Sequence, residues 1–144
     1  MRIRYVAAVM AIALSGCMTP SQPGVDGRVA TTIEVESGHE FEIAVNQEAK
    51  LTGTTLSIRF RGVSNDSRCP SDVKCVWAGN AVARFTLAAS GHSNLDASLN
   101  TTLDPKMVKY AGYTLTLKGL KPIPKSGSSI PSADYVAVLE VAAN

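Results

Sequence analysis

The chain has 144 residues, of which 45% are hydrophobic, and this length is enough for one domain with a single core. Its 14 basic and 12 acidic side chains leave a formal charge of +2 at pH 7. Arg2 and Arg4 lie within residues 1–16, and the remaining chain has 12 basic and 12 acidic side chains, so without that segment there is no basic excess for nucleic acid and we expect no nucleic-acid partner.

The N-terminus has the features of a bacterial export signal. Two arginines among the first four residues supply positive charge, and the apolar run 6–14 is much shorter than the roughly 20 residues of a membrane-spanning helix. Residues 14–17 read Leu-Ser-Gly-Cys and resemble the lipobox of bacterial lipoproteins. The resemblance implies that residues 1–16 are a signal peptide and that Cys17 is acylated after cleavage. The alternative is an ordinary secretory signal with an incidental cysteine.

Acylation of Cys17 would attach the mature protein to a membrane through lipid. Two or more acyl chains anchor a protein stably, at ~0.8 kcal/mol per buried methylene. Met18, rather than an aspartate, follows the cysteine. By the sorting pattern of such lipoproteins, this implies the outer membrane, with the protein facing the periplasm. Residues 17–30 contain two prolines and two glycines and are interpreted as a tether, which leaves residues 31–144 as the folded domain.

From residue 31 onward, apolar residues recur at every second position, which is the period of a β-strand. Segments with this pattern, separated by Gly and Pro, are residues 31–36, 40–45, 54–63, 80–89, 95–103, 112–120 and 134–142. The first two are joined by Ser37-Gly38 and predict a hairpin. We therefore predict an all-β domain, a single antiparallel β-sandwich of about seven or eight strands, with a small β-barrel as the alternative.

The predicted hairpin would place four glutamates on one exposed face: Glu34, Glu36, Glu40 and Glu42. Like charges at neighbouring positions destabilise a sheet, so we expect Arg59 and Arg61 to lie opposite these carboxylates. Each exposed pair would contribute only ~0–1 kcal/mol. A cation-binding acidic ridge is the functional alternative. The later lysines are interpreted in the same way, as a solvated and cross-paired face: Lys118, Lys121 and Lys125.

The other two cysteines, Cys69 and Cys75, lie in the stretch DSRCPSDVKCVWAGNA. Their spacing does not fit a redox C-x-x-C motif, and structural zinc needs four ligands. In an oxidising compartment the pair is expected to form a disulfide, worth ~2.4 kcal/mol on the chain-entropy formula. We predict a disulfide-pinned loop that leads into a strand beginning near Val76. Trp77 is expected to pack against the bridge or the core.

Three segments together resemble a group of small secreted or lipid-anchored bacterial domains: DSRCPSDVKCVWAGNA, GYTLTLKGLKPIP and the final DYVAVLEV. The first matches the pattern D-S-R-C-P-x-x-V-x-C-x-W-x-G. The resemblance covers residue 63 to the C-terminus and implies the disulfide and a β fold. Because the group has no assigned activity, it implies no catalytic residue.

Nothing in the sequence indicates catalysis, and we expect neither an enzyme nor a cofactor. No nucleophile elbow or glycine-rich phosphate loop is present, and His92 stands alone in a turn. Three residues around the cysteine loop could offer oxygen ligands to calcium: Asn65, Asp66 and Asp72. Their spacing matches no EF-hand, so metal binding is the lowest alternative.

We expect instead a binding module that presents a loop to a periplasmic protein. The candidate interaction residues lie in the cysteine loop: Arg68, Pro70, Asp72, Lys74 and Trp77. The proline-rich segment 121–131 is the second candidate loop. A purely structural envelope lipoprotein is the alternative. An exposed Trp77 would favour the binding module, and a buried Trp77 would favour the structural protein.

Overall fold

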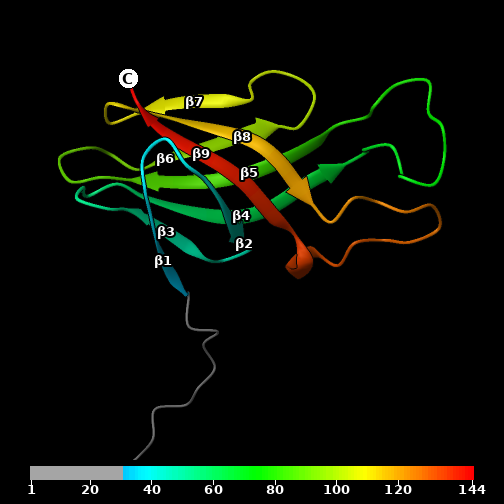
Figure 1. Ribbon diagram of the computed structural model, residues 1–144, viewed down its shortest axis with the longest axis horizontal. Helices are drawn as coiled ribbons and strands as arrows, with labels where there is room; N and C mark the ends of the chain where they lie inside the picture. The colour runs from blue at the N-terminus through cyan, green and yellow to red at the C-terminus, as the bar shows by residue number, and fades with distance from the viewer. Residues whose placement is uncertain (1–30) are drawn as a thin grey trace, which may run out of the picture.

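Alternating burial along the strands gives each sheet one face for a shared core. In β5 (Ala81–Ala88), every second residue from Ala81 to Leu87 is buried. The computed structural model describes residues 31–144, which form nine strands in two sheets and one short 3-10 helix. The predicted all-β sandwich is therefore confirmed (Figure 1).

The first sheet has the strand order β1-β3-β4-β5-β6 and the second has the order β2-β9-β8-β7. The other strands of the first sheet are β1 (Thr32–Val35), β3 (Glu48–Leu51), β4 (Ser57–Asp66) and β6 (Leu95–Asn100). The second sheet contains β2 (Glu40–Ala44), β7 (Met107–Tyr110), β8 (Tyr113–Lys121) and β9 (Val136–Ala143). The 3-10 helix η1 (Ser132–Asp134) precedes β9. Among these strands only β1 and β3 pair in parallel.

The predicted hairpin between the first two strands is wrong. β1 pairs with β3, whereas β2 pairs with β9 in the other sheet. The chain crosses between the sheets at residues 36–39, where the backbone N–H of Gly38 donates to the carbonyl of Val141 at 2.7 Å. An alternating pattern of apolar residues indicates a strand but does not specify the strand with which it pairs. The pattern was therefore compatible with a hairpin of the first two strands and also with their placement in different sheets.

The expected pairing of the early glutamates with Arg59 and Arg61 is wrong for the same reason. Arg59 lies 3.0 Å from Glu48, a residue of β3. The second sheet forms ion pairs of its own, which join Lys118 to Glu40 and Glu140, and Lys121 to Glu42. Lys118 and Lys121 are thus cross-paired as predicted, whereas Lys125 and Arg61 form no ion pair within residues 31–144.

The core between the sheets is built from large apolar side chains. Phe60 and Phe85 stack on neighbouring strands with ring centroids 5.1 Å apart. Other fully buried side chains are Ile43, Leu51, Ile58, Leu87, Leu99, Leu115, Leu139 and Val141. Each such burial stabilises the fold by about 1.5–3 kcal/mol, so the sandwich is a firm support for its connections.

Connections gather at the two ends of the sandwich (Figure 1). The strand register brings together three of them at one end: residues 67–80 between β4 and β5, 101–107 up to the start of β7, and 122–135 between β8 and β9. We call these three segments the loop end. The C-terminus and the turn between β5 and β6 lie at the opposite end.

Candidate functional site

A disulfide-closed ribbon protrudes from the loop end (Figure 1). Cys69 and Cys75 form the predicted bridge, with sulfurs 2.11 Å apart and Cα atoms 5.9 Å apart. The ribbon continues β4 and β5 beyond the sandwich. The N–H of Ser67 donates to the carbonyl of Asn80 at 2.7 Å, and the N–H of Cys69 donates to that of Ala78 at 2.8 Å. The two arms therefore stay hydrogen-bonded up to the bridge.

The residues after the bridge differ from the sequence prediction. β5 begins at Ala81 rather than near Val76, and Trp77 is 53% exposed, so of the two packing positions predicted for it the core is excluded. Gly79 explains the difference, because its φ of +70° interrupts the extended backbone. A Cβ at this position would lie 1.8 Å from the carbonyl oxygen of Ser67. The chain turns at this glycine and leaves Val76 and Trp77 in solvent.

Arg68 ties the base of the ribbon to the second sheet. Its side chain is only 12% exposed, and its Nε and Nη2 donate to the two oxygens of Asp66 at 2.9 and 2.6 Å. Nη1 donates to the carbonyl of Leu120 at 2.6 Å, and Nη2 also donates to that of Pro122 at 3.0 Å. The hydroxyl of Tyr135 donates to Oδ2 of Asp66 at 3.0 Å. The guanidinium of Arg68 is thus committed to the scaffold.

This cluster also sets the charge states at the base of the ribbon. Burial alone would raise the pKa of Asp66, but the hydrogen bonds and charge of Arg68 outweigh it and hold this pKa below its ordinary value of 3.8. Burial, together with the neighbouring Asp66, raises the pKa of Tyr135. Asp66 is therefore ionised and Tyr135 is protonated at neutral pH.

Asp72 braces the tip of the ribbon against the connection between β8 and β9. Its Oδ1 accepts a hydrogen bond from the N–H of Ser126 at 2.9 Å, and its Oδ2 accepts one from the Ser126 hydroxyl. These two hydrogen bonds lower the pKa of Asp72. The N–H of Ser71 donates to the carbonyl of Pro124 at 2.9 Å. The two loops predicted as separate candidates therefore form one braced unit.

Asn80 holds the third connection and was not singled out by the sequence. It is 9% exposed, and its Nδ2 donates to Oδ1 of Asn100 at 2.8 Å. Its Oδ1 accepts from the N–H groups of Thr102 and Leu103 at 3.0 and 3.3 Å. Asn after Gly79 is an ordinary turn sequence, so no local signal marks this buried amide.

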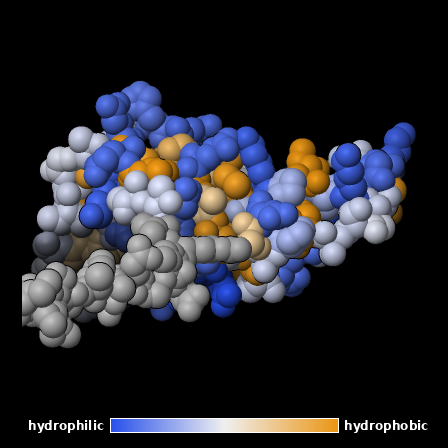
Figure 2. Space-filling view, turned by 90° about the horizontal axis from the view of Figure 1, so that it is seen from below, coloured by the Kyte–Doolittle hydropathy of each residue, from blue (hydrophilic) through white to orange (hydrophobic). Residues whose placement is uncertain are grey.

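Exposed apolar side chains gather at the loop end. Within residues 31–144, the exposed large hydrophobic residues are Val73 (45%), Val76 (106%), Trp77 (53%), Leu103 (50%), Met107 (54%) and Ile123 (65%). All six belong to the three segments of the loop end. Figure 2 shows hydrophobic residues between hydrophilic ones at this narrow end of the molecule. Single exposed apolar residues are ordinary, but their collection at one end is typical of an interaction surface.

The five predicted interaction residues separate into two groups. Lys74 and Trp77 are exposed on the ribbon. Asp72 is also exposed, although its carboxylate is hydrogen-bonded to Ser126, whereas Pro70 is half-buried and Arg68 makes the internal contacts described above. The exposed surface of the ribbon is thus formed by residues 71–78.

The oxygens proposed for calcium do not converge. The carboxylate of Asp66 faces Arg68, and that of Asp72 faces Ser126. Within residues 31–144, no group of three or more His, Cys, Asp or Glu side chains could hold a metal ion. His92 lies at the opposite end, where its ring is 5.8 Å from that of Tyr110.

Cys17 and the predicted signal peptide lie outside the described residues, so the lipid anchor stays a prediction. Among the helices of residues 31–144, none has the length and apolar character needed to cross a membrane. The chain matches no protein-family model, no curated protein and no solved structure. Function is therefore inferred from the geometry of the loop end.

Proposed function

We propose that this protein is a lipid-anchored lipoprotein of the bacterial envelope that binds a periplasmic protein through its loop end. The lipobox-like sequence ending at Cys17 supports the anchor, and Met18 favours the outer membrane. The 14-residue segment 17–30 can span up to about 46–50 Å when fully extended, which lets the domain reach a partner away from the lipid surface.

The gathering of the exposed large apolar side chains of residues 31–144 at the loop end carries this proposal. Fully burying one Val, Leu, Ile or Met side chain gains about 1.5–3 kcal/mol. A protein that covers Trp77 and its neighbours recovers this free energy. Protein interfaces are commonly built from such apolar anchors inside a polar rim, and Trp is enriched among the residues that dominate binding.

Rigidity of the ribbon supports binding further. The Cys69–Cys75 bridge closes the tip, and the contacts of Arg68 and Asp72 fix it against the second sheet. A surface that is already ordered loses less conformational entropy on association than a mobile loop. The loop end is therefore suited to present Trp77 in one orientation.

The polar groups of the loop end support binding rather than catalysis. A general acid or base works best with a pKa near the ambient pH. The pKa of Asp66 is lowered and that of Tyr135 is raised, so both move away from neutrality. The exposed Trp77 also favours the binding module over a purely structural lipoprotein, which would bury it.

Site-specific photo-crosslinking in intact cells tests the proposal. A photoreactive amino acid replaces Trp77 or Ile123 at the loop end, or Asn94 in the turn at the opposite end as a matched exposed control. We expect the same protein adduct from positions 77 and 123 and not from position 94. Adducts with lipid alone, no adduct, or the same adduct from position 94 would contradict the proposal.

A further inference from the structure

Residues 31–144 contain four arginines, and two of them form ion pairs with a carboxylate while Arg61 and Arg84, on neighbouring strands of the first sheet, do not. The paired ones are Arg59 with Glu48 and Arg68 with Asp66. Arg61 and Arg84 make no ion pair and no side-chain hydrogen bond within the described part of the chain. Because the guanidinium fork matches the geometry of carboxylates and phosphates, two unpaired arginines on neighbouring strands are candidates to bind an anion.

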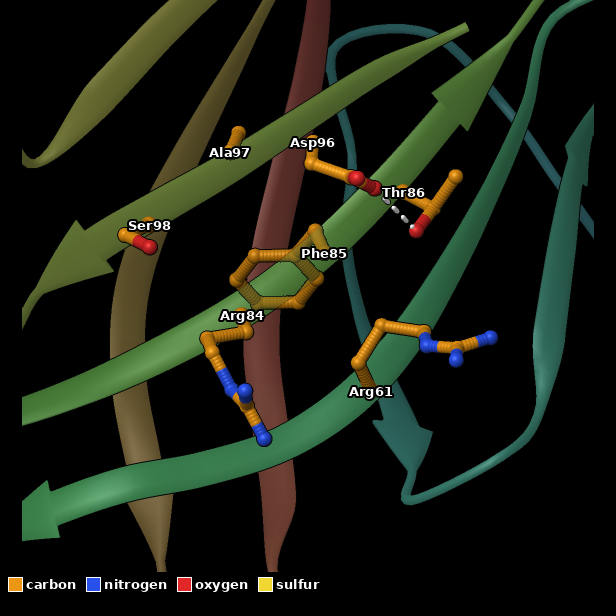
Figure 3. A pocket seen from close by; sticks show the side chains of 7 residues that line it. All are labelled: Arg61, Arg84, Phe85, Thr86, Asp96, Ala97 and Ser98. Atoms are coloured by element: carbon orange, nitrogen blue, oxygen red, sulfur yellow. Dashed lines mark hydrogen bonds between the residues drawn. The ribbon is translucent and has the colours of Figure 1, made fainter.

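A β-bulge sets the positions of the two arginines on the neighbouring strands β4 and β5. The register between β4 and β5 shifts between Phe60 and Gly62, which makes Arg61 the extra residue, and Gly62 lies opposite Arg84. Bulges re-aim the side chain of the extra residue. Arg61 and Arg84 are both exposed, on the outer face of the sheet. In Figure 3 the two guanidinium groups extend in different directions from the border of the hollow, so an anion held by both must bring these flexible side chains together.

The two arginines border an open hollow of about 490 Å³ over β4, β5 and β6 (Figure 3). Its other polar side chains are those of Thr86, Asp96 and Ser98. The Thr86 hydroxyl donates a hydrogen bond to Oδ1 of Asp96 at 2.7 Å. The one carboxylate that lines the hollow is therefore hydrogen-bonded to a hydroxyl group rather than to an arginine. In Figure 3 no hydrogen bond reaches either guanidinium group.

We propose that this hollow binds a phosphate ester. The planar donors of a guanidinium match two phosphate oxygens, and two such groups can hold one phosphate from different sides. The hydroxyl of Ser98 offers a further donor. Asp96 can accept a hydrogen bond from a hydroxyl or ammonium group on the same ligand. A phosphate with such a substituent therefore fits the lining better than inorganic phosphate does.

In a bacterial envelope, a phosphate ester with such a substituent can be either a soluble molecule or the headgroup of a phospholipid. The volume of about 490 Å³ lies in the range of small-molecule sites. The hollow is on the face of the first sheet, away from the loop end, so it is independent of the proposed protein partner. Its ligand and that partner could be bound at the same time.

Isothermal titration calorimetry on the intact, acylated protein in vesicles of digalactosyldiacylglycerol, a lipid without phosphate, tests this site. Phosphoethanolamine and inorganic phosphate are the probes. We expect saturable binding of phosphoethanolamine and weaker binding of inorganic phosphate. The titration is repeated in vesicles that also contain phosphatidylethanolamine. Loss of the phosphoethanolamine signal there identifies the lipid headgroup as the occupant, and a retained signal identifies a soluble ester.

Three variants locate the binding. Arg61→Gln and Arg84→Gln should each weaken phosphoethanolamine binding by about tenfold or more, because each removes charged hydrogen bonds to the phosphate. Arg59→Gln is the matched control on the same strand and should bind like the wild type. The absence of saturable binding in the phosphate-free vesicles would overturn the proposal. An equal loss in Arg59→Gln, or no loss in Arg61→Gln and Arg84→Gln, would overturn it as well.

A fourth variant tests the second half of the ligand. Asp96→Asn keeps an oxygen for the Thr86 hydroxyl but loses the negative charge. We expect it to bind inorganic phosphate at least as well as the wild type and to lose the preference for phosphoethanolamine. An unchanged preference would exclude Asp96 from the site. Equal melting temperatures of all variants would show that these effects are not losses of fold.

Discussion

Gly79 lies against Ser67 on the opposite arm of the disulfide ribbon. Its φ is +70°, and an added Cβ would meet the carbonyl oxygen of Ser67 at 1.8 Å. Gly91 has a similar φ of +78°, but nothing lies within 4 Å of its Cβ position. Comparing alanine substitutions at these two glycines therefore separates the energetic cost of a left-handed backbone from the cost of a steric clash.

We expect Gly91→Ala to lower the free energy of unfolding by about 1–2 kcal/mol, the cost of a left-handed backbone. Gly79→Ala should lower it by about 3 kcal/mol or more, because the arms of the ribbon must also move apart. Urea denaturation of both variants measures the difference. Equal losses would contradict the close approach at Gly79.

Asp66 makes the free energy of unfolding depend on pH in the acid range. Its folded pKa lies below the ordinary value of 3.8, so the unfolded state binds more protons as the pH falls. The stabilisation by Asp66 is therefore present above about pH 4 and is lost as the pH falls through the folded pKa. Asp72 adds to the same trend, because its pKa is also lowered.

Asp66→Asn should lower the free energy of unfolding at pH 7 by about 2 kcal/mol or more, because it leaves the largely buried charge of Arg68 without its carboxylate. The variant should also lose stability less steeply below pH 4, while Asp72 keeps part of the slope. Urea denaturation across this range measures both effects. An acid dependence as steep as that of the wild type would contradict the assigned role of Asp66.

At the level of residues, the sequence predicted the bridge but not its supports. Cys69 and Cys75 are close in the chain, and their pairing was predicted as the simplest use of two cysteines in the expected oxidising compartment. The guanidinium of Arg68 donates a hydrogen bond to the carbonyl of Leu120, 52 positions away. The carboxylate of Asp72 accepts one from the hydroxyl of Ser126, 54 positions away. Such contacts depend on how the two sheets are stacked, which no local pattern encodes.

At the level of elements, the alternating segments were predictable, and two short strands without a clear alternation were not. β1, β2, β4, β5, β6, β8 and β9 coincide with predicted segments within a few residues. β3 and β7 have four residues each, EAKL and MVKY, and Glu, Ala and Lys are poor strand formers. Their pairing with β4 and β8 makes them strands. The false hairpin has the same origin, since periodicity does not identify a partner strand.

The disulfide ribbon should keep its place without the bridge but lose stability. We expect Cys69→Ser/Cys75→Ser to lower the free energy of unfolding by about 2 kcal/mol, from the entropy of the short closed loop. The contacts of Arg68 and Asp72 should hold the sandwich and the ribbon base together. Urea denaturation measures the loss, and hydrogen exchange of β5 and β6 amides should stay slow. Global unfolding of the variant would contradict this division of roles.

At the level of the whole molecule, the strand register assembles a surface that the sequence scatters. The apolar residues of the loop end extend from Val73 to Ile123, and none of the three segments is unusually apolar by itself. Only the stacking of two sheets brings these segments to one end. Sequence analysis could therefore name Trp77 as a candidate, but it could not predict the surface around it.

Trp77 is the chain's only tryptophan, so its fluorescence reports on the loop end alone. We expect red-shifted emission that is readily quenched by iodide in the purified protein. Trp77→Ala should change the free energy of unfolding by no more than about 0.5 kcal/mol, as for other surface residues. Phe60→Ala, in the core, should lower it by about 3–5 kcal/mol. A large loss of stability in Trp77→Ala would show that this side chain is structural.

Hydroxyl-radical labelling in intact cells and in purified protein tests the role of the loop end most directly. Trp77 and Met107 are exposed in the free protein and carry reactive side chains, and His92 at the opposite end is the internal control. If a partner covers the loop end, labelling of Trp77 and Met107 falls in cells while that of His92 is unchanged. Equal labelling of all three residues in both samples would show that nothing binds there.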